Sequence, residues 1–298
     1  MTERGPASIG ASRWASAALF LLPALAVLLV FRIVPIGQAF YLSFTKWNGV
    51  GVPEWIGGAN FAAVLSDPVF LAALKNNLFV LLSLPLWVIG PLVVAAMIHG
   101  GVPGARFFRL MVFLPAVLSP VVVGAYYNVL LRYNGPFNRF LRDIGLGDFA
   151  HQWLSDPSTA LPVVVLILIW ATFGIGVLIY LAALAQVNPE LYDAAEIDGA
   201  TWFQTQRHVT LPATRRTVEF WFVIVLISTF TTVFPFIYTL TRGGPGYSTY
   251  LLDYYVYDAA FFGGSFGYAS AVGVLLLVIV SAISLTSIWL FRRGQEPS

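Results

Sequence analysis

Long runs without a charged residue alternate with short polar segments along this 298-residue chain. The charge-free windows are residues 14–31, 76–105, 110–131, 157–189, 220–241 and 259–291. A helix needs about 20 apolar residues to cross a hydrocarbon core about 30 Å thick, and all windows but the first reach that length. The first window falls just short and continues beyond Arg32 into a further apolar stretch. Because lipid leaves backbone polar groups without outside partners, each window is predicted to be a helix.

The pattern therefore predicts an all-α membrane protein with six transmembrane helices. Membrane β-barrels show segments of about 10 residues with alternating polarity, whereas these runs are continuous. Composition agrees, because 58% of the residues are hydrophobic, 10% are charged and the mean hydropathy is +0.81; a soluble domain carries about 25% charged residues. We expect a short tail over residues 1–13, a transmembrane domain over 14–292 and a second tail over 293–298.

The basic residues are spread unevenly between the two sides of such a protein. Six spans place both termini on one side, which also carries the loops near residues 99–109 and 188–217. That side holds nine basic residues: Arg4, Arg13, Arg106, Arg109, Arg207, Arg215, Arg216, Arg292 and Arg293. The other side holds six: Lys46, Lys75, Arg132, Arg139, Arg142 and Arg242. The positive-inside rule then predicts that both termini are cytoplasmic.

A compact polar segment, residues 188–212, separates the fourth and fifth windows. Asn188 can cap a helix whose first position suits Pro189. Gly199 is the natural place for a positive φ and a turn. A second short helix is predicted after it, ended by Leu211 and Pro212. The segment thus reads as a cytoplasmic helix–turn–helix elbow between helices 4 and 5.

The spacing inside this elbow resembles the EAA motif of the membrane subunits of bacterial ABC importers. That motif runs Glu-Ala-Ala, three residues, Gly, nine residues, Ile, one residue, Leu-Pro. The chain matches it without gaps at Asp193, Ala194, Ala195, Gly199, Val209, Leu211 and Pro212. It departs from the motif in having Asp193 for Glu and Val209 for Ile. In the family this elbow is the coupling helix, which docks in a groove of a cytoplasmic ATPase. The resemblance implies that role for the matched residues, of which we take Asp193, Ala194, Ala195, Gly199, Leu211 and Pro212 as the coupling site.

Other segments resemble the sugar-transporter branch of the same family, the relatives of maltose and glycerol-3-phosphate permeases. They are WIGGANFAAVLSDPVFLAALKNN (55–77), WLSDPSTALP (153–162), GGPGYST (243–249) and FGYASAVGVLLL (266–277). The resemblance implies a permease of a bacterial cytoplasmic membrane that imports a sugar or related polyol and forms half of the translocation pathway. Its expected partners are a second homologous permease, a cytoplasmic ATPase dimer, an extracytoplasmic solute-binding protein and membrane lipid, and no nucleic acid is expected.

No residues in the chain suggest covalent chemistry. The GGPGYST stretch lacks the Gly-Lys-Ser/Thr ending of a phosphate-binding P-loop. His99, His151 and His208 fall in three different loops, and the chain has no cysteine, so no metal site is expected. We therefore predict a transport subunit without an ATPase site or a bound cofactor, with ATP and Mg²⁺ held by the partner ATPase.

The substrate path is predicted from polar and aromatic residues within the windows. Sugars bind by ring stacking and hydroxyl hydrogen bonds, which favours Tyr127, Asn128, Trp170, Tyr180, Thr232 and Tyr238. Two other roles stay open for each of them, since Trp and Tyr also gather at membrane interfaces and Thr packs helices together.

Two rival functions remain as alternatives. An ion-gradient-driven secondary carrier predicts ionisable groups inside the spans, and a membrane enzyme needs acids or histidines near a membrane face. Apart from Arg32, the spans lack charges, and the acids of the elbow are better explained by the motif. The sequence names neither the sugar nor the particular ATPase.

Overall fold

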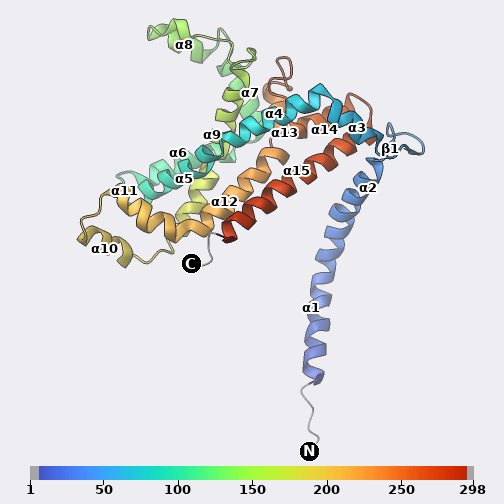
Figure 1. Ribbon diagram of the computed structural model, residues 1–298. Helices are drawn as coiled ribbons and strands as arrows, with labels where there is room; N and C mark the ends of the chain where they lie inside the picture. The colour runs from blue at the N-terminus through green and yellow to red at the C-terminus, as the bar shows by residue number, and fades with distance from the viewer. Residues whose placement is uncertain (1–6, 294–298) are drawn as a thin grey trace, which may run out of the picture. The chain divides into compact units, whose positions relative to one another are not determined.

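The computed structural model describes residues 7–293, which form two compact units (Figure 1). The first contains residues up to 64 together with 259–274, and the second contains 65–258 together with the C-terminal part from 275. Each unit is described by itself.

The first unit begins with one long helix and continues into a short β ribbon. Helix α1 (Ala7–Leu28) runs through a π-helical turn, η1 (Leu29–Ile33), into α2 (Val34–Leu42), so the helix continues past Arg32 as expected. Strands β1 (Thr45–Lys46) and β2 (Glu54–Trp55) pair antiparallel, and α3 (Ala59–Ser66) follows. The prediction of an all-α chain is wrong at this ribbon, where Gly49 and Gly51 adopt positive φ and reverse the chain.

The second unit is a helical assembly centred on α9 (Ala160–Leu184). The first half of the chain contributes α4 (Pro68–Leu82), α5 (Leu84–His99), α6 (Ala105–Val117), α7 (Pro120–Leu130), α8 (Pro136–Asp143) and the short 3₁₀ turn η2 (Gly147–Phe149). The second half contributes α10 (Glu190–Ile197), α11 (Trp202–Thr205), the π turn η3 (Gln206–Thr210), α12 (Leu211–Thr231), α13 (Phe234–Leu240), α14 (Leu252–Phe261) and α15 (Phe266–Arg293). Helices α14 and α15 each extend across the boundary between the units. Helix α9 packs against α5, α6, α12 and α13.

Glycines let three of these helices approach α9 closely. A Cβ at Gly174 would lie 2.4 Å from the Val112 carbonyl oxygen of α6, and a Cβ at Gly176 would lie 2.9 Å from both Pro91 of α5 and Trp221 of α12. The contact of α7 with α13 depends in the same way on Gly124, whose added Cβ would lie 2.1 Å from the Thr239 hydroxyl. Small residues at such crossings let membrane helices pack backbone to backbone.

Four helices in the described part of the chain are long and apolar enough to cross a membrane, and the number rises to six if each of two bent pairs counts as one span. The four are Ala18–Leu42, Pro68–His99, Ala160–Leu184 and Phe266–Arg293. The expected single helices over 110–131 and 220–241 are wrong in detail. The first is broken between α6 and α7 with a bend of 99°, and the second between α12 and α13 with a bend of 48°.

A proline lies just after each break. Pro120 and Pro235 each lie in the first turn of the second helix of a pair, where a missing N–H costs nothing. A residue before proline is pushed out of the α region, and Ser119 accordingly has ψ of 143°. Asp67 caps the start of α4 by accepting a hydrogen bond of 2.8 Å from the Val69 N–H. Of the expected tails, residues 1–6 and 294–298 lie outside the described residues, whereas 7–13 are already helical.

Candidate functional site

The elbow over residues 188–212 begins with a capped helix. The Asn188 side-chain oxygen accepts a hydrogen bond of 3.1 Å from the Glu190 N–H, and its amide nitrogen donates to the Glu190 carboxylate at 3.0 Å. Glu190 and Asp193 lie in the first turn of α10, where the helix dipole favours negative charge. The predicted hydrogen bond of Asn188 to the start of this helix is present, but α10 begins one residue later than predicted, at Glu190 and not at Pro189.

A Schellman turn ends α10 at Gly199. The Gly199 N–H donates to the Glu196 carbonyl at 3.0 Å, and the Ala200 N–H donates to the Ala195 carbonyl at 2.9 Å. These two bonds require a left-handed residue at Gly199. Its φ is +70°, which confirms the predicted positive φ. The turn is thus fixed by backbone hydrogen bonds and by the absence of a side chain.

The second helix of the elbow starts with a capping box and does not end where the motif does. Thr201 accepts from the Gln204 N–H, while the Gln204 side chain accepts from the Thr201 N–H at 2.7 Å. Helical backbone then continues through η3 into α12, so the predicted stop at Leu211 and Pro212 is wrong. Pro212 cannot donate to the carbonyl four residues back, and the π turn just before it accommodates that loss. The same arrangement occurs at η1, which immediately precedes Val34 and Pro35.

Two contacts tie the elbow to its own unit. The Tyr192 hydroxyl and the Thr210 hydroxyl lie 3.3 Å apart, and the Tyr192 ring contacts the His99 ring at the end of α5 with centroids 5.8 Å apart. The motif residues themselves remain accessible, since Asp193, Ala194, Leu211 and Pro212 are exposed and Ala195 is half-buried. A hollow of about 630 Å³ beside the elbow is bordered by Asp193 and Glu196. The elbow is thus an accessible, small-residue surface edged by carboxylates.

The residues predicted for a substrate path fall at several places in the second unit. The Tyr127 and Trp170 rings meet edge to face at 5.4 Å, and Trp170 is 38% exposed. Asn128 donates to the Thr239 carbonyl at 2.7 Å, which joins α7 to α13. Tyr238 is 37% exposed on α13. The structure therefore brings Tyr127 and Trp170 together.

Thr232 and Tyr180 have contrasting surroundings. Thr232 lies at the break between α12 and α13 and lines a cavity of about 240 Å³. Among the other residues lining that cavity are Trp87, Thr172, Trp221 and Ser228. Tyr180 is fully buried, and its hydroxyl has no hydrogen-bond partner within the described residues.

Comparison with known proteins supplies the family. Residues 56–293 match the family described as binding-protein-dependent transport system inner membrane component. The chain belongs to this family of importer permeases. The match covers every helix from α4 to α15, including the elbow.

Individual relatives cover nearly the whole permease. A probable ABC transporter permease protein YurN of Bacillus subtilis is 36% identical over 286 residues, which cover 93% of this chain and 96% of that protein. The lactose transport system permease protein LacF of Rhizobium radiobacter is 31% identical, with 93% and 94% covered. Among solved structures, the bacterial alginate ABC transporter in complex with an alginate pentasaccharide-bound periplasmic protein contains a similar chain. It has a TM-score of 0.82 at 27% identity, covering 96% of this chain and 97% of that one.

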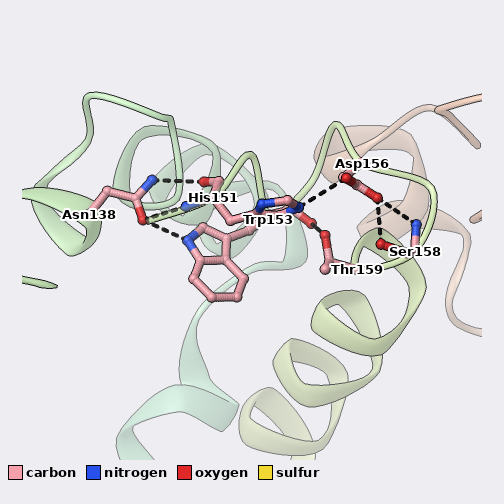
Figure 2. Close-up of polar contacts among 6 residues, drawn as sticks. All are labelled: Asn138, His151, Trp153, Asp156, Ser158 and Thr159. Carbon is pink, nitrogen blue, oxygen red and sulfur yellow. Dashed lines mark hydrogen bonds and ion pairs between the residues drawn. The ribbon is translucent and has the colours of Figure 1, made fainter. Parts of the chain in front are cut away.

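Sequence reasoning missed a buried asparagine that organises the segment after α7 of the permease (Figure 2). Asn138 is fully buried and donates to the carbonyls of Arg132, Tyr133 and His151. Its side-chain oxygen accepts from the His151 N–H and from the Trp153 indole N–H at 2.8 Å. The GPFN stretch around it gives no sequence signal for this role, because a loop asparagine is usually solvated.

A second polar cluster follows directly. Asp156 accepts from the Ser158 hydroxyl at 2.6 Å and from the Ser158 N–H at 2.8 Å, and His151 Nε2 lies 3.0 Å from its other oxygen. The Ser158 bonds, with a smaller effect of His151, hold the pKa of Asp156 below its ordinary value of 3.8. Thr159 closes the segment by donating to the Trp153 carbonyl at 3.0 Å. Over residues 7–293, no group of three or more His, Cys, Asp or Glu side chains is placed to hold a metal ion.

Proposed function

We propose that this permease carries a sugar or related polyol and is driven by a cytoplasmic ATPase that docks on the elbow. The sugar class is supported by the relatives, which include a lactose permease and an alginate transporter. A docked ATPase dimer, a second homologous permease and an extracytoplasmic solute-binding protein would complete the transporter. Six spans with both termini cytoplasmic, as the distribution of basic residues favours, would place the elbow on the ATPase side.

The geometry of the elbow carries this proposal. Two neighbouring alanines, Ala194 and Ala195, let another backbone approach closely, and the exposed carboxylate of Asp193 can pair with a basic group of the partner. The Schellman turn at Gly199 fixes the angle between α10 and α11. Because helical backbone runs unbroken from Trp202 to Thr231, a tilt imposed on the elbow reaches the α12–α13 break directly.

The substrate path proposed here starts from the cavity at Thr232. Its hydroxyl-bearing and indole-bearing lining suits hydroxyl-rich ligands, and Tyr127, Asn128, Trp170 and Tyr238 would extend the path along α7, α9 and α13. Tyr180 would contact a substrate only after α9 or its neighbours move, because it is fully buried. The mechanism is then alternating access: closure of the ATPase pair moves the elbows, and the permease pair opens outward to receive substrate.

Purification of the tagged permease from gently solubilised membranes tests the coupling role, with mass spectrometry of the proteins that accompany it. The variants are Gly199→Val and Asp193→Arg. The controls are Gly145→Val and Asp148→Arg, because Gly145 also has a positive φ of 82° with nothing within 4 Å of an added Cβ, and Asp148 is also exposed.

An ATPase that accompanies the wild type and both controls but is lost or reduced in the two elbow variants supports the proposal. Equal recovery with all five chains rejects the elbow as the docking site. If no ATPase accompanies the wild type, and uptake continues in cells depleted of ATP but holding an ion gradient, the protein is a secondary carrier.

A further inference from the structure

The break between α12 and α13 leaves backbone groups that a continuous helix would satisfy. The Thr229 carbonyl would normally accept from the N–H of residue 233, but the helix ends at Thr231 and restarts at Phe234 with a 48° bend. Unpaired backbone groups within a membrane span are costly. The side chain of Asn77 on α4 supplies the missing donor, since its Nδ2 lies 3.1 Å from the Thr229 oxygen.

The other end of the same amide holds a different segment. Asn77 Oδ1 accepts a hydrogen bond of 2.9 Å from the N–H of Leu252, the first residue of α14. Asn77 has no exposed surface. The two partners need one donor and one acceptor, and the side-chain amide of Asn77 supplies both. Asn77 thus joins the broken helix to the start of α14.

Asp253, the next residue of α14, faces the other side of the break. Its Oδ1 accepts from the Tyr254 N–H at 2.8 Å, and its Oδ2 is buried without a hydrogen-bond partner among the described residues. Burial raises the pKa of Asp253 to about 7, and the N–H groups of Phe234 and Val233 lie near enough to oppose that rise. Asp253 is therefore a buried carboxyl group near the residues that begin α13.

The break therefore has one buried polar side chain on each side, Asn77 and Asp253. Asn77 bonds to the backbone of Leu252, and Asp253 is the residue that follows it. The cavity described above begins at this point, because Thr229, Thr232 and Val233 line it. The loop before α14 is held on α4 as well, since Asn76 donates to the carbonyls of Tyr247 and Tyr250 at 2.8 and 2.9 Å.

We propose that Asn77 and Asp253 are positioning residues that couple the bend between α12 and α13 to the segment 247–253. A displacement of that segment then changes the bend, and with it the opening of the cavity at Thr232. This inference rests on the proposed function, in which that cavity belongs to the substrate path. Hydrogen bonds weaken steeply with distance and angle. Leu252 therefore cannot move away from α4 while Asn77 keeps both of its hydrogen bonds. If Leu252 does move, either the carbonyl of Thr229 or the N–H of Leu252 loses its partner.

The permease contains no cysteine, so a single Thr232→Cys reporter can measure the state of the cavity. A small charged thiol reagent is added to native membranes, and the rate of labelling is followed. The test variants are Asn77→Asp, which sets a second acceptor against the Thr229 carbonyl, and Asp253→Asn, which keeps the shape and removes the charge. Asn138→Asp is the matched control, because Asn138 is also a fully buried amide but bonds only to residues 132–153, outside the segment 247–253.

The labelling rate of Cys introduced at position 232 is expected to change about tenfold in Asn77→Asp and in Asp253→Asn, as the loss of a buried polar contact shifts the equilibrium of the bend. Asn138→Asp should change it less than about twofold. Unchanged labelling in both test variants, or an equal change in the control, overturns the proposal. Should one test variant fail to accumulate in the membrane, the other decides; if both fail, the pair is needed for folding and the positioning role is rejected.

Labelling requires no bound ATPase, so its result is independent of the elbow experiment. If the elbow variants still recover the ATPase but the labelling rate changes as expected, the elbow proposal fails and the link between α14 and the break stands. Unchanged labelling alone would leave the elbow as the docking site.

Discussion

The indole N–H of Trp221 on α12 donates a hydrogen bond of 3.0 Å to the backbone carbonyl of Trp87 on α5. That carbonyl lacks its usual helical partner because Pro91, four residues further on, has no N–H. Trp87 in turn donates from its own indole to the Thr172 hydroxyl of α9 at 2.6 Å. Three helices that line the cavity at Thr232 are therefore joined by a relay that starts at a proline.

Replacing Trp221 by Phe should destabilise the permease by about 1–3 kcal/mol, because the buried Trp87 carbonyl loses the donor that stands in for the missing helical N–H. Thermal unfolding of the purified protein measures the change. Trp289→Phe is the control, since Trp289 is 49% exposed and the Arg293 guanidinium lies 3.8 Å from its ring centroid. There the loss should stay below about 1 kcal/mol. Equal losses in the two variants would contradict the role of the relay.

Gly176→Ala should destabilise the crossing of α5, α9 and α12 by about 1–3 kcal/mol through overpacking. The added Cβ would lie 2.9 Å from Pro91 and from the Trp221 indole nitrogen. Gly273→Ala, within α15, has nothing within 4 Å of the added Cβ and should instead stabilise by about 0.5–1 kcal/mol. Opposite shifts of the unfolding midpoint are the expected result, and a tolerated alanine at position 176 would show that the helices separate there.

Asn138→Ala should open the segment after α7 to proteases while leaving the transmembrane helices folded. The substitution removes all the side-chain hydrogen bonds of a buried amide, with an expected local loss of roughly 2–3 kcal/mol. Limited proteolysis with identification of the cut sites measures it. Asn134→Ala, at an exposed neighbouring position, should leave the cleavage pattern unchanged.

The Asp156 carboxylate should stabilise the same segment over most of the pH range. Its pKa is lower in the folded protein than in the unfolded chain, so the stabilisation is present above pH 3.8 and disappears as the pH falls through the lowered value. Asp156→Asn should therefore be cleaved faster than the wild type at neutral pH, and the difference should vanish only below about pH 4. A difference that already vanished at pH 6 would assign the effect to another group.

Local turn chemistry was predictable from the sequence, whereas long-range polar contacts were not. Asp67 before Pro68 and Gly199 after a helical stretch each have a short-range physical signal, and the structure has the cap and the turn at those positions. Pro212 misled the prediction, because a π turn lets a helix pass through a proline that a sequence pattern treats as a stop. The break at Pro120 fell inside a window whose lack of charge hides it.

The roles of Asn77, Asn138 and Asp253 have no local signal. Each depends on partners far away in the sequence or in a loop without periodicity; Asn77, for example, contacts residues 229 and 252. A single asparagine in an apolar window is equally consistent with helix packing or with a substrate path. Only the positions of a free carbonyl and a free N–H on either side of it distinguish these roles.

Asn76 and Asn77 are consecutive on α4, and consecutive residues of an α-helix point about 100° apart. Asn76 holds the carbonyls of Tyr247 and Tyr250 from one direction, and Asn77 holds Thr229 and Leu252 from another. Hydrogen bonds that hold a helix from two different directions fix its rotation about its own axis. A roll of helix α4 about its own axis would therefore break hydrogen bonds of both asparagines, whereas a tilt that carries their partners along would not.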